Sequence, residues 1–281
     1  MDLRDWIGRT DTAEDVVGAT PVAAMAATLD WPAQRPAAGT PLPPLWHWLY
    51  FLPLAPASEI GDDGHPKRGG FLPPVPLPRR MFAGSRMSCR EPLRVGDALT
   101  RVSTILDVSE KSGRSGTLVF VRVGHEVHRN GAAQAAFSEV QDIVYREAPR
   151  PGDPAPAPQA APTQSAWERR IVPDPVTLFR YSALTFNGHR IHYDRRYVTE
   201  VEGYPGLVVH GPLIATLLLD LLRRELPGAE VAGFEFRAVR PVFDLNPFFV
   251  CGAPQADGRT VNLWARDHEG WLTMNAVATL R

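Results

Sequence analysis

Residues 184–194, LTFNGHRIHYD, bring together side chains that can transfer protons or bind metal. Asn187, His189, His192 and Asp194 lie within eight residues, and Arg190 stands between the two histidines. Three interpretations are open: a metal site, an acid–base site, or a polar loop with no chemical task. The surrounding residues and the elements that hold them rank these three.

A metal site is the weakest of the three interpretations. Histidines three residues apart can ligate one ion from a helix, but Asn187–Gly188 is a turn dipeptide, so this segment should bend instead. Neither cysteine of the chain is near. Asp194 precedes RRYVTEV and is explained by a plainer role, the N-cap of a short helix. We therefore expect no bound metal.

Acid–base chemistry fits the same residues better. A neutral histidine is suited to removing a proton from water near pH 7 or returning one, and the Asn187 amide could orient that water. Downstream, GLVVHGPLIA puts Gly211 at the start of an apolar helix, where the first N–H groups lack internal partners and the helix end is partly positive. These groups could polarise a thioester carbonyl as an oxyanion hole, and a glycine lets the substrate approach closely.

Two further histidines have two interpretations each. His210 precedes the helix start and could contact substrate, although a lone histidine there is more often structural. His189 could contact substrate or be a turn residue bonded to backbone.

Composition limits the classes of partner. The net charge of the 281 residues is −1, so nothing calls for nucleic acid or an anionic membrane. Two cysteines exclude a disulfide framework. The longest apolar run, GLVVHGPLIATLLLDLL, is interrupted by His210 and Asp220 and is too polar to span a membrane. The first residues lack the apolar core of a signal peptide. We expect a soluble cytoplasmic protein.

A Pro/Ala-rich stretch divides the chain into two halves. Residues 148–166 should form an extended, exposed linker. It separates an N-terminal domain, residues 1–147, from a C-terminal catalytic domain, residues 167–281. Each half has one apolar run that follows a small residue and a proline, at 20–30 and at 211–220, which predicts a helix.

Each half then ends in β-type runs. Turn dipeptides separate these runs at Ser112–Gly113, Asn130–Gly131, Asp257–Gly258 and Glu269–Gly270. The predicted fold class is therefore α+β, a double hot-dog fold in which two antiparallel sheets each wrap a central helix. Residues of about 40–86 are rich in proline and aromatics, and we interpret them as a long ordered excursion without regular structure, a lid or tunnel wall.

The segment LTFNGHRIHYDRRYVTEVEGYPGLVVHGPLIATLLLDLL resembles the MaoC-like hydratase family. It is most similar to the branch of type 2 hydroxyacyl-thioester dehydratases and mesaconyl-CoA or itaconyl-CoA hydratases. In the N-terminal half, DGHPKRGGFLPPVPLPRRMFAG, KSGRSGTLVFVRV and QDIVYR agree with that branch.

The resemblance implies a function. It implies a hydro-lyase for a short branched dicarboxylic enoyl-CoA, such as mesaconyl-CoA or itaconyl-CoA, giving citramalyl-CoA. Coenzyme A is then part of the substrate, and no separate cofactor is expected. The alternatives are a 3-hydroxyacyl-thioester dehydratase of fatty-acid metabolism and a non-catalytic acyl-CoA-binding protein.

The resemblance also implies roles residue by residue. The family motif is Asp-x-Asn-Pro-x-His followed by a His-Gly helix start, and its catalytic pair is the Asp and the His. The motif His falls on His192 and the backbone amide donor on Gly211. The motif Asn falls on His189, the Pro on Arg190 and the Asp on Asn187. Because an amide cannot accept a proton as a carboxylate does, the paired mechanism does not transfer intact.

A free carboxylate on the acyl group would need a cationic partner. Arg190, beside the motif histidines, is one candidate for bidentate binding, and Arg79 and Arg80 are alternatives. Arg190 could instead face solvent or a phosphate. Arg237 and Arg240, on a predicted strand, are candidates for the phosphates of coenzyme A. Because hot-dog sheets often pair edge to edge, a homodimer is expected by analogy.

Overall fold

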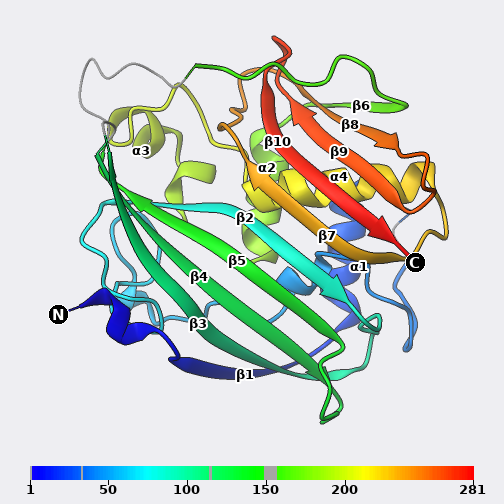
Figure 1. Ribbon diagram of the computed structural model, residues 1–281, viewed down its shortest axis with the longest axis horizontal. Helices are drawn as coiled ribbons and strands as arrows, with labels where there is room; N and C mark the ends of the chain where they lie inside the picture. The colour runs from blue at the N-terminus through cyan, green and yellow to red at the C-terminus, as the bar shows by residue number, and fades with distance from the viewer. Residues whose placement is uncertain (1, 33, 114–115, 149–156) are drawn as a thin grey trace.

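The described strands form one antiparallel ten-stranded sheet (Figure 1). The computed structural model describes residues 2–32, 34–113, 116–148 and 157–281. In sheet order the strands are β1 (Thr10–Val16), β3 (Ala98–Gly113), β4 (Gly116–Arg129), β5 (Phe137–Arg146), β2 (Arg79–Cys89), β7 (Val231–Ala238), β10 (Leu272–Leu280), β9 (Thr260–Arg266), β8 (Phe248–Pro254) and β6 (Trp167–Ile171).

The helices are short apart from one. The α-helices are α1 (Ala19–Thr28), α2 (Pro175–Leu184), α3 (Arg195–Glu200) and α4 (Gly211–Glu225), and the 3-10 helices are η1 (Leu3–Trp6), η2 (Trp46–Leu49), η3 (Ala57–Glu59) and η4 (Arg190–His192). In the part of the chain that the structure describes, no helix is long and apolar enough to cross a membrane.

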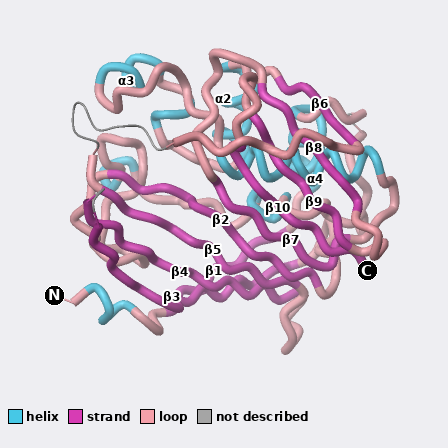
Figure 2. The backbone as a smooth tube through the Cα atoms, turned by 45° about the horizontal axis from the view of Figure 1, so that its top comes forward, coloured by secondary structure: helices cyan, strands magenta, loops and turns pink. Residues whose placement is uncertain are grey.

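The two halves of the chain meet at the centre of the sheet. Five neighbouring strands come from each half, and β2 pairs with β7 in the register Gly84↔Arg237 to Ser88↔Gly233 (Figure 2). The architecture is α+β, as predicted, but the two predicted sheets are joined edge to edge into one. The edge that could have paired with a second molecule at β2 or β7 is thus used within the chain.

Most of the predicted turns are confirmed. Asn130 and Gly131 both have positive φ, 53° and 74°, and lie between β4 and β5, while Gly258 and Gly270 have φ of 68° and 90° at the ends of β8–β9 and β9–β10. The turn predicted at Ser112–Gly113 is wrong, because β3 continues to Gly113 and pairs there with Gly116. Residues 114–115, between β3 and β4, lie outside the described residues.

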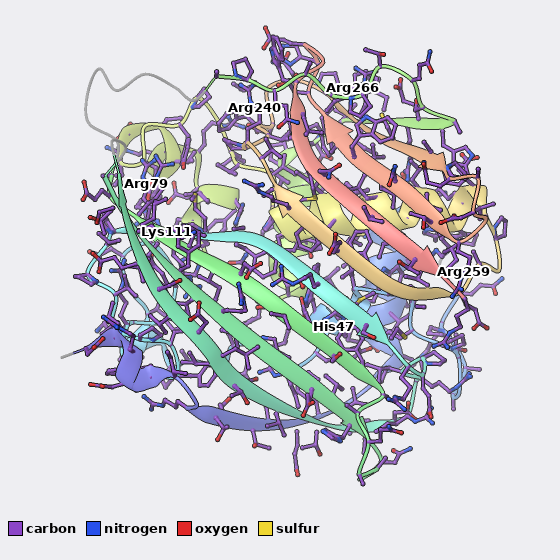
Figure 3. The ribbon with its side chains drawn as sticks, in the orientation of Figure 1. His47, Arg79, Lys111, Arg240, Arg259 and Arg266 are labelled. Carbon is purple, nitrogen blue, oxygen red and sulfur yellow. The ribbon has the colours of Figure 1, made fainter. Side chains whose placement is uncertain are left out.

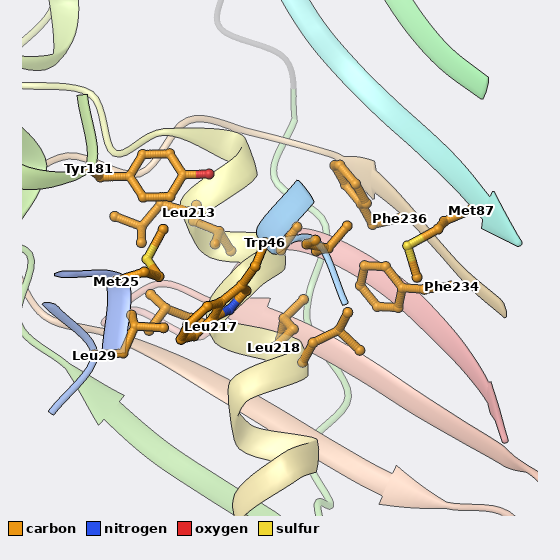
Figure 4. Packing of buried hydrophobic residues seen from close by; sticks show 14 of the residues in the cluster. Met25, Leu29, Trp46, Met87, Tyr181, Leu213, Leu217, Leu218, Phe234 and Phe236 are labelled. Carbon is orange, nitrogen blue, oxygen red and sulfur yellow. The ribbon is translucent and has the colours of Figure 1, made fainter. Parts of the chain in front are cut away.

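Helix α4 is the buried element that the sequence predicts. All ten of its residues from Leu213 to Leu222 are buried, and it packs against the C-terminal strands. Helix α1 does not have a core of its own. Met25 of α1 and the C-cap residue Leu29 pack into the same cluster as Leu213 and Leu217, together with Trp46 from η2 (Figure 4). One hydrophobic core therefore spans both halves.

Three regions differ from the sequence prediction. Residues 79–86, predicted as part of an irregular excursion, belong to β2. Strands β1 and β6 and helix α2 were not predicted. The predicted linker lies outside the described residues at 149–156, and its remainder is exposed except at Ala161, which is 8% exposed and packs against Trp264. The predicted domain boundaries themselves stay a prediction.

The N-terminal half contains a buried carboxylate. Glu139 on β5 is 2% exposed, and its Oε2 accepts hydrogen bonds from His47 Nε2 at 2.9 Å and Trp48 Nε1 at 3.2 Å. Its Oε1 accepts from Ser85 Oγ at 2.7 Å. Burial alone would raise the pKa of Glu139, but the hydrogen bonds and the charge of His47 lower it to about 2. Glu139 thereby ties η2 to β2 and β5.

Replacing Glu139 should destabilise the fold. Glu139→Ala leaves two buried donors, on His47 and Ser85, and the partly buried Trp48 donor without an acceptor. We expect the free energy of unfolding to fall by about 3–5 kcal/mol in urea titrations at pH 7. Glu126→Ala, which removes an exposed carboxylate from β4, is the matched control and should change it by about 0.5 kcal/mol or less. A similarly small change in the free energy of unfolding of both variants would contradict the stabilising role of Glu139. Because the pKa of Glu139 is lowered in the folded state, its contribution is complete above pH 4.5 and is lost as the pH falls through about 2.

Candidate active site

His192 is a buried, neutral imidazole with one free nitrogen. It lies in η4, is 7% exposed, and its Nδ1 is 2.7 Å from the carbonyl oxygen of Val208. Because a carbonyl can only accept, Nδ1 carries the hydrogen and Nε2 carries the lone pair. No described residue hydrogen-bonds to Nε2. Burial lowers the pKa of His192 to about 4, so the ring is neutral at pH 7.

His210 holds the His192 ring in place. The two rings stack with centroids 3.7 Å apart and an interplanar angle of 18°. The other side of His210 is bonded through Nε2 to Ser182 Oγ of α2 at 2.8 Å. His210 is fully buried, at 0% exposure, and burial lowers its pKa well below the usual value. The burial of His210 favours the structural alternative, and the expected contact between His210 and substrate stays a prediction.

Asn187 lies in the predicted bend. Helix α2 ends at Leu184, and Asn187 Oδ1 accepts a hydrogen bond from the His189 N–H at 3.0 Å, as in an Asx turn. The amide nitrogen Nδ2 has no acceptor among the described residues and can donate to a bound oxygen. Asp194 is confirmed as the N-cap of α3, since its Oδ1 accepts from Tyr197 N at 3.0 Å.

The start of α4 is open. The N–H of Gly211 has no acceptor in the described chain, and a Cβ built at Gly211 meets only the Phe82 carbonyl oxygen, at 4.0 Å. The chain's own packing therefore does not require a glycine at this position. The free space faces a helix N-terminus, which is partly positive and can hold a developing negative charge.

A loop from the N-terminal half docks onto this site. A Cβ at Gly64 would lie 1.8 Å from the Gly188 carbonyl oxygen, and Gly64 has a positive φ of 88°, so only glycine fits. The Arg190 N–H donates to the Asp63 carbonyl oxygen at 2.9 Å. This docking brings residues 61–65 against residues 187–192.

The docked loop carries a carboxylate–imidazole pair, Asp63 and His65, which was not predicted from the sequence. Asp63 Oδ1 accepts from His65 N at 2.9 Å, and Oδ2 lies 3.0 Å from His65 Nδ1. The His65 ring lies against the His189 ring, with centroids 4.1 Å apart, and His189 is edge-on to His192 at 5.4 Å. A sequence signal for this pair was available in DGHPKR, where an Asp and a His lie two residues apart inside one of the N-terminal segments that resemble the MaoC-like hydratases.

The protonation of these rings follows from burial. Burial lowers the pKa of His189 to about 2, with further lowering by His65 and His192. Burial also lowers the pKa of His65, and the Asp63 carboxylate partly opposes that change. For Asp63, burial would raise the pKa, but the hydrogen bonds from His65 bring it below its usual range. The pair is thus a carboxylate and a neutral imidazole at pH 7.

The same three residues are the group that could hold a metal in the described chain. One ligand atom each from Asp63, His65 and His189 lie within 4.8 Å of one another. However, both Asp63 oxygens already accept hydrogen bonds from His65, so a metal ion would have to displace that pairing. The His189–His192 pair considered from the sequence is not this group.

The guanidinium of Arg190 is occupied within the chain. Its Nε and Nη2 donate to Asp194 Oδ2 at 3.0 and 2.8 Å, and Nη1 donates to the Asp62 carbonyl oxygen at 2.9 Å. A bidentate clamp exists, but it holds Asp194. Arg190 therefore fastens the docked loop to α3, and its expected role as a substrate clamp has no support in these contacts.

Arg79 and Arg240 have partners within the chain, and Arg237 is exposed. Arg79 donates to the Glu202 carbonyl oxygen and pairs with the Glu202 carboxylate at 3.2 Å, next to α3. Arg240, labelled in Figure 3, lies beyond the end of β7. Its Nη1 is 3.6 Å from Asp267 Oδ2. Arg237 is exposed on β7, on the face opposite to the buried Phe236.

Arg80 is the candidate whose charge reaches the imidazoles. Its charge lowers the pKa of both His65 and His189, and its guanidinium also acts on the Tyr145 hydroxyl. No described carboxylate lies within ion-pair distance of Arg80. Of the five candidate arginines, Arg80 is therefore the one whose positive charge is available to bind an anionic ligand next to the imidazoles.

Comparisons with known proteins agree on one family. The model of hydroxyacyl-thioester dehydratase type 2 matches residues 45–244. Mesaconyl-C(4)-CoA hydratase of Chloroflexus aurantiacus is 49% identical over 282 residues, which cover 99% of this chain and 98% of that protein. A MaoC-like dehydratase from Phytophthora capsici superposes with a TM-score of 0.71 at 15% identity, over 100% of this chain and 98% of that one. A Mycobacterium tuberculosis protein with a double hot-dog fold gives 0.54 at 14%, over 98% and 96%.

These matches settle the class and the family. The fold is a double hot-dog, shared with a MaoC-like dehydratase structure, and the family match makes the chain a hydro-lyase. The chain belongs to the hydroxyacyl-thioester dehydratase type 2 family.

Gly211→Ala should separate activity from stability. The new methyl group meets no protein atom closer than 4.0 Å, and alanine favours a helix over glycine by about 0.5–1 kcal/mol. We expect an unchanged or higher melting temperature, but a fall in kcat/KM for hydration of an enoyl-CoA of about tenfold or more, because the methyl group fills the space before the N–H. Gly18→Ala, at the start of α1, is the matched control and should keep full activity. Full activity of Gly211→Ala would contradict the role of the Gly211 N–H in stabilising an oxyanion.

Proposed function

We propose that this protein adds water to the double bond of a short branched dicarboxylic enoyl-CoA, with mesaconyl-CoA as the first candidate. One observation carries the proposal: 49% identity to mesaconyl-C(4)-CoA hydratase over nearly the full length of both chains. The geometry of His192 and Gly211 supports it, because it offers one lone pair for a proton and one open N–H for an oxyanion.

The roles follow the course of the addition. His192 Nε2 draws a proton from the attacking water, whose oxygen is held by Asn187 Nδ2 and bonds to the β carbon. The electrons of the double bond move toward the thioester, and the enolate oxygen lies at the Gly211 N–H. His192 then returns that proton to the α carbon. From mesaconyl-CoA, whose double bond is conjugated with the thioester, the product is citramalyl-CoA, and every atom of it comes from water and the enoyl thioester, so coenzyme A enters as part of the substrate. Itaconyl-CoA would give the same product by this course only after its double bond has moved into conjugation with the thioester.

The second carboxylate of such a substrate fits Arg80. A guanidinium binds a carboxylate through two parallel hydrogen bonds, and Arg80 has no carboxylate partner of its own in the described chain. It also lies close enough to His65 and His189 for its charge to act on both. Arg80 would thus bind the free carboxylate while the thioester carbonyl lies at Gly211.

The family match favours a second candidate. Hydroxyacyl-thioester dehydratases run the reverse reaction on 3-hydroxyacyl groups without a second carboxylate, and the family model covers residues 45–244. A non-catalytic acyl-CoA-binding protein would not need a free Nε2 at His192.

The expected cytoplasmic location and the expected homodimer stay predictions.

A panel of enoyl-CoA thioesters tests the proposal directly. We expect the enoyl-thioester ultraviolet absorbance to fall when the protein is mixed with mesaconyl-CoA, and to fall more slowly with crotonyl-CoA. His192→Ala should lower kcat/KM by about 10²-fold or more, as expected for loss of an acid–base group, whereas His128→Ala on β4 should keep full activity. A loss under tenfold in His192→Ala would refute its role, and a stable absorbance with every thioester would refute the enzyme.

Arg80→Gln tests the carboxylate contact. Loss of a charge-assisted hydrogen bond costs about 1.5–3 kcal/mol, so we expect kcat/KM for mesaconyl-CoA to fall by roughly 10–100-fold and that for crotonyl-CoA to change by less than about threefold. Arg86→Gln is the matched control on the same strand, where Arg86 pairs with Asp142 at the surface. Equal losses for both substrates would show that Arg80 does not bind the free carboxylate.

A further inference from the structure

Four imidazoles from both halves of the chain form one cluster. His65 lies against His189, His189 lies edge-on to His192, and His192 stacks on His210. The first comes from the N-terminal half and the other three from the C-terminal half. In the described chain, His65 is the one member of this cluster with a carboxylate partner, which is Asp63.

The pairing with Asp63 fixes how His65 presents its nitrogens. An ionised carboxylate can only accept, so His65 Nδ1 carries the hydrogen that Asp63 Oδ2 accepts at 3.0 Å. Nε2 then carries the lone pair, and no described residue hydrogen-bonds to it. The second Asp63 oxygen accepts the His65 N–H, which locks the carboxylate against the loop that carries the ring. The His65 side chain is 16% exposed, unlike the fully buried His210.

The site needs a group that can hold a proton between two steps. Hydration takes a proton from water and later delivers one to the α carbon, so some residue must store it. The Asn187 amide cannot, and its Oδ1 is already an acceptor for the His189 N–H. His189 and His192, with pKa values lowered by burial to about 2 and about 4, hold a proton weakly.

We propose that His65, oriented by Asp63, is the proton-storing residue of this site and takes the place of the carboxylate that the family motif puts at Asn187. The inference rests on the proposed hydratase function and changes one assignment within it. The water proton ends on His65, while His192 accepts a hydrogen bond from the same water. His65 is a catalytic residue in this scheme, and Asp63 is a positioning residue that also balances the charge of the imidazolium.

The steps balance without any further reactant. The water donates one hydrogen bond to His65 Nε2 and the other to His192 Nε2. As the oxygen bonds to the β carbon, its proton passes to His65 Nε2, and the π electrons form the enolate whose oxygen lies at the Gly211 N–H. The His65 imidazolium then gives that proton to the α carbon and returns to its neutral form. No net charge remains on the protein, and the dehydration of the product follows the same steps in reverse.

Three variants of the full-length protein test the assignment. His65→Gln keeps hydrogen-bonding groups but cannot store a proton, and kcat for mesaconyl-CoA should fall by about 10²–10⁴-fold with KM changed by less than about threefold. His65→Phe keeps a ring against His189 and should be equally inactive. Asp63→Asn removes the charge that raises the pKa of His65, so kcat should fall less and the acidic limb of the kcat/KM profile should move to lower pH.

The pH profile separates proton transfer from a structural role. In the unmodified protein the acidic limb should lie below pH 6.5, because burial lowers the pKa of His65, and this limb should vanish in His65→Gln. His268→Gln, which replaces an exposed histidine, is the matched control and should keep both rate and profile. Melting temperatures confirm that each variant is folded. If His65→Gln does not fold, His65→Phe and Asp63→Asn decide the question.

The outcomes keep this inference apart from the proposed function. No hydration by the unmodified protein would refute the function itself. Hydration by the unmodified protein together with a folded His65→Gln or His65→Phe variant within threefold of it would refute the role of His65 alone. Loss of activity on treatment with a chelator, restored by zinc, would also refute it, because Asp63, His65 and His189 would then hold a metal ion.

Discussion

A backbone contact between two glycines holds the histidine cluster together. Gly64 and Gly188 come so close that a Cβ at Gly64 would lie 1.8 Å from the Gly188 carbonyl oxygen. Any side chain would push the loops apart and separate Asp63 and His65 from His189. The Arg190 N–H and guanidinium reinforce the contact by donating to the Asp63 and Asp62 carbonyl oxygens. The candidate site is therefore composite: the C-terminal half supplies His192 and the helix start, and the N-terminal half supplies the carboxylate.

Burial gives this site its chemistry as much as residue type does. The rings of His192 and His210 are removed from water, which keeps both neutral at pH 7 and leaves the lone pair of His192 Nε2 free. The same low-dielectric surroundings strengthen the attraction between the N-terminus of α4 and a developing oxyanion. The long apolar helix is thus more than core filling. Because it is buried along ten residues, its partly positive end opens directly at the stacked imidazoles.

The sequence predicts the local parts of this arrangement and misses the tertiary ones. Asp194 as a cap, the bend at Asn187–Gly188 and the buried helix from Gly211 each have a signal within a few residues, and the structure has all three. The substrate-binding role predicted for Arg190 did not take into account its neighbour Asp194, four residues on, whose carboxylate already forms an ion pair with the guanidinium. For His65 the segment DGHPKR was a weak local signal, because the role of this residue depends on the contact of its loop with another loop in the other half. Short edge strands such as β1 and β6 lack a clear alternating pattern for the same reason: their pairing partners, and not their own sequence, define them.

The amide at Asn187 makes physical sense if the substrate is itself an anion. A carboxylate in the motif would face the free carboxylate of a dicarboxylic acyl group, and two such charges about 5 Å apart repel by roughly 3 kcal/mol at an effective dielectric constant of about 20. A neutral amide at that position removes this cost. The negative charge needed to stabilise a protonated base is instead placed behind His65, at Asp63, with an imidazole between it and the ligand. In the proposed reaction, the charge of Arg80, which acts on both His65 and His189, would be opposite to that of the substrate carboxylate. A hydratase for uncharged acyl chains gains nothing from this rearrangement, so the position of the carboxylate is itself an argument for a dicarboxylic substrate.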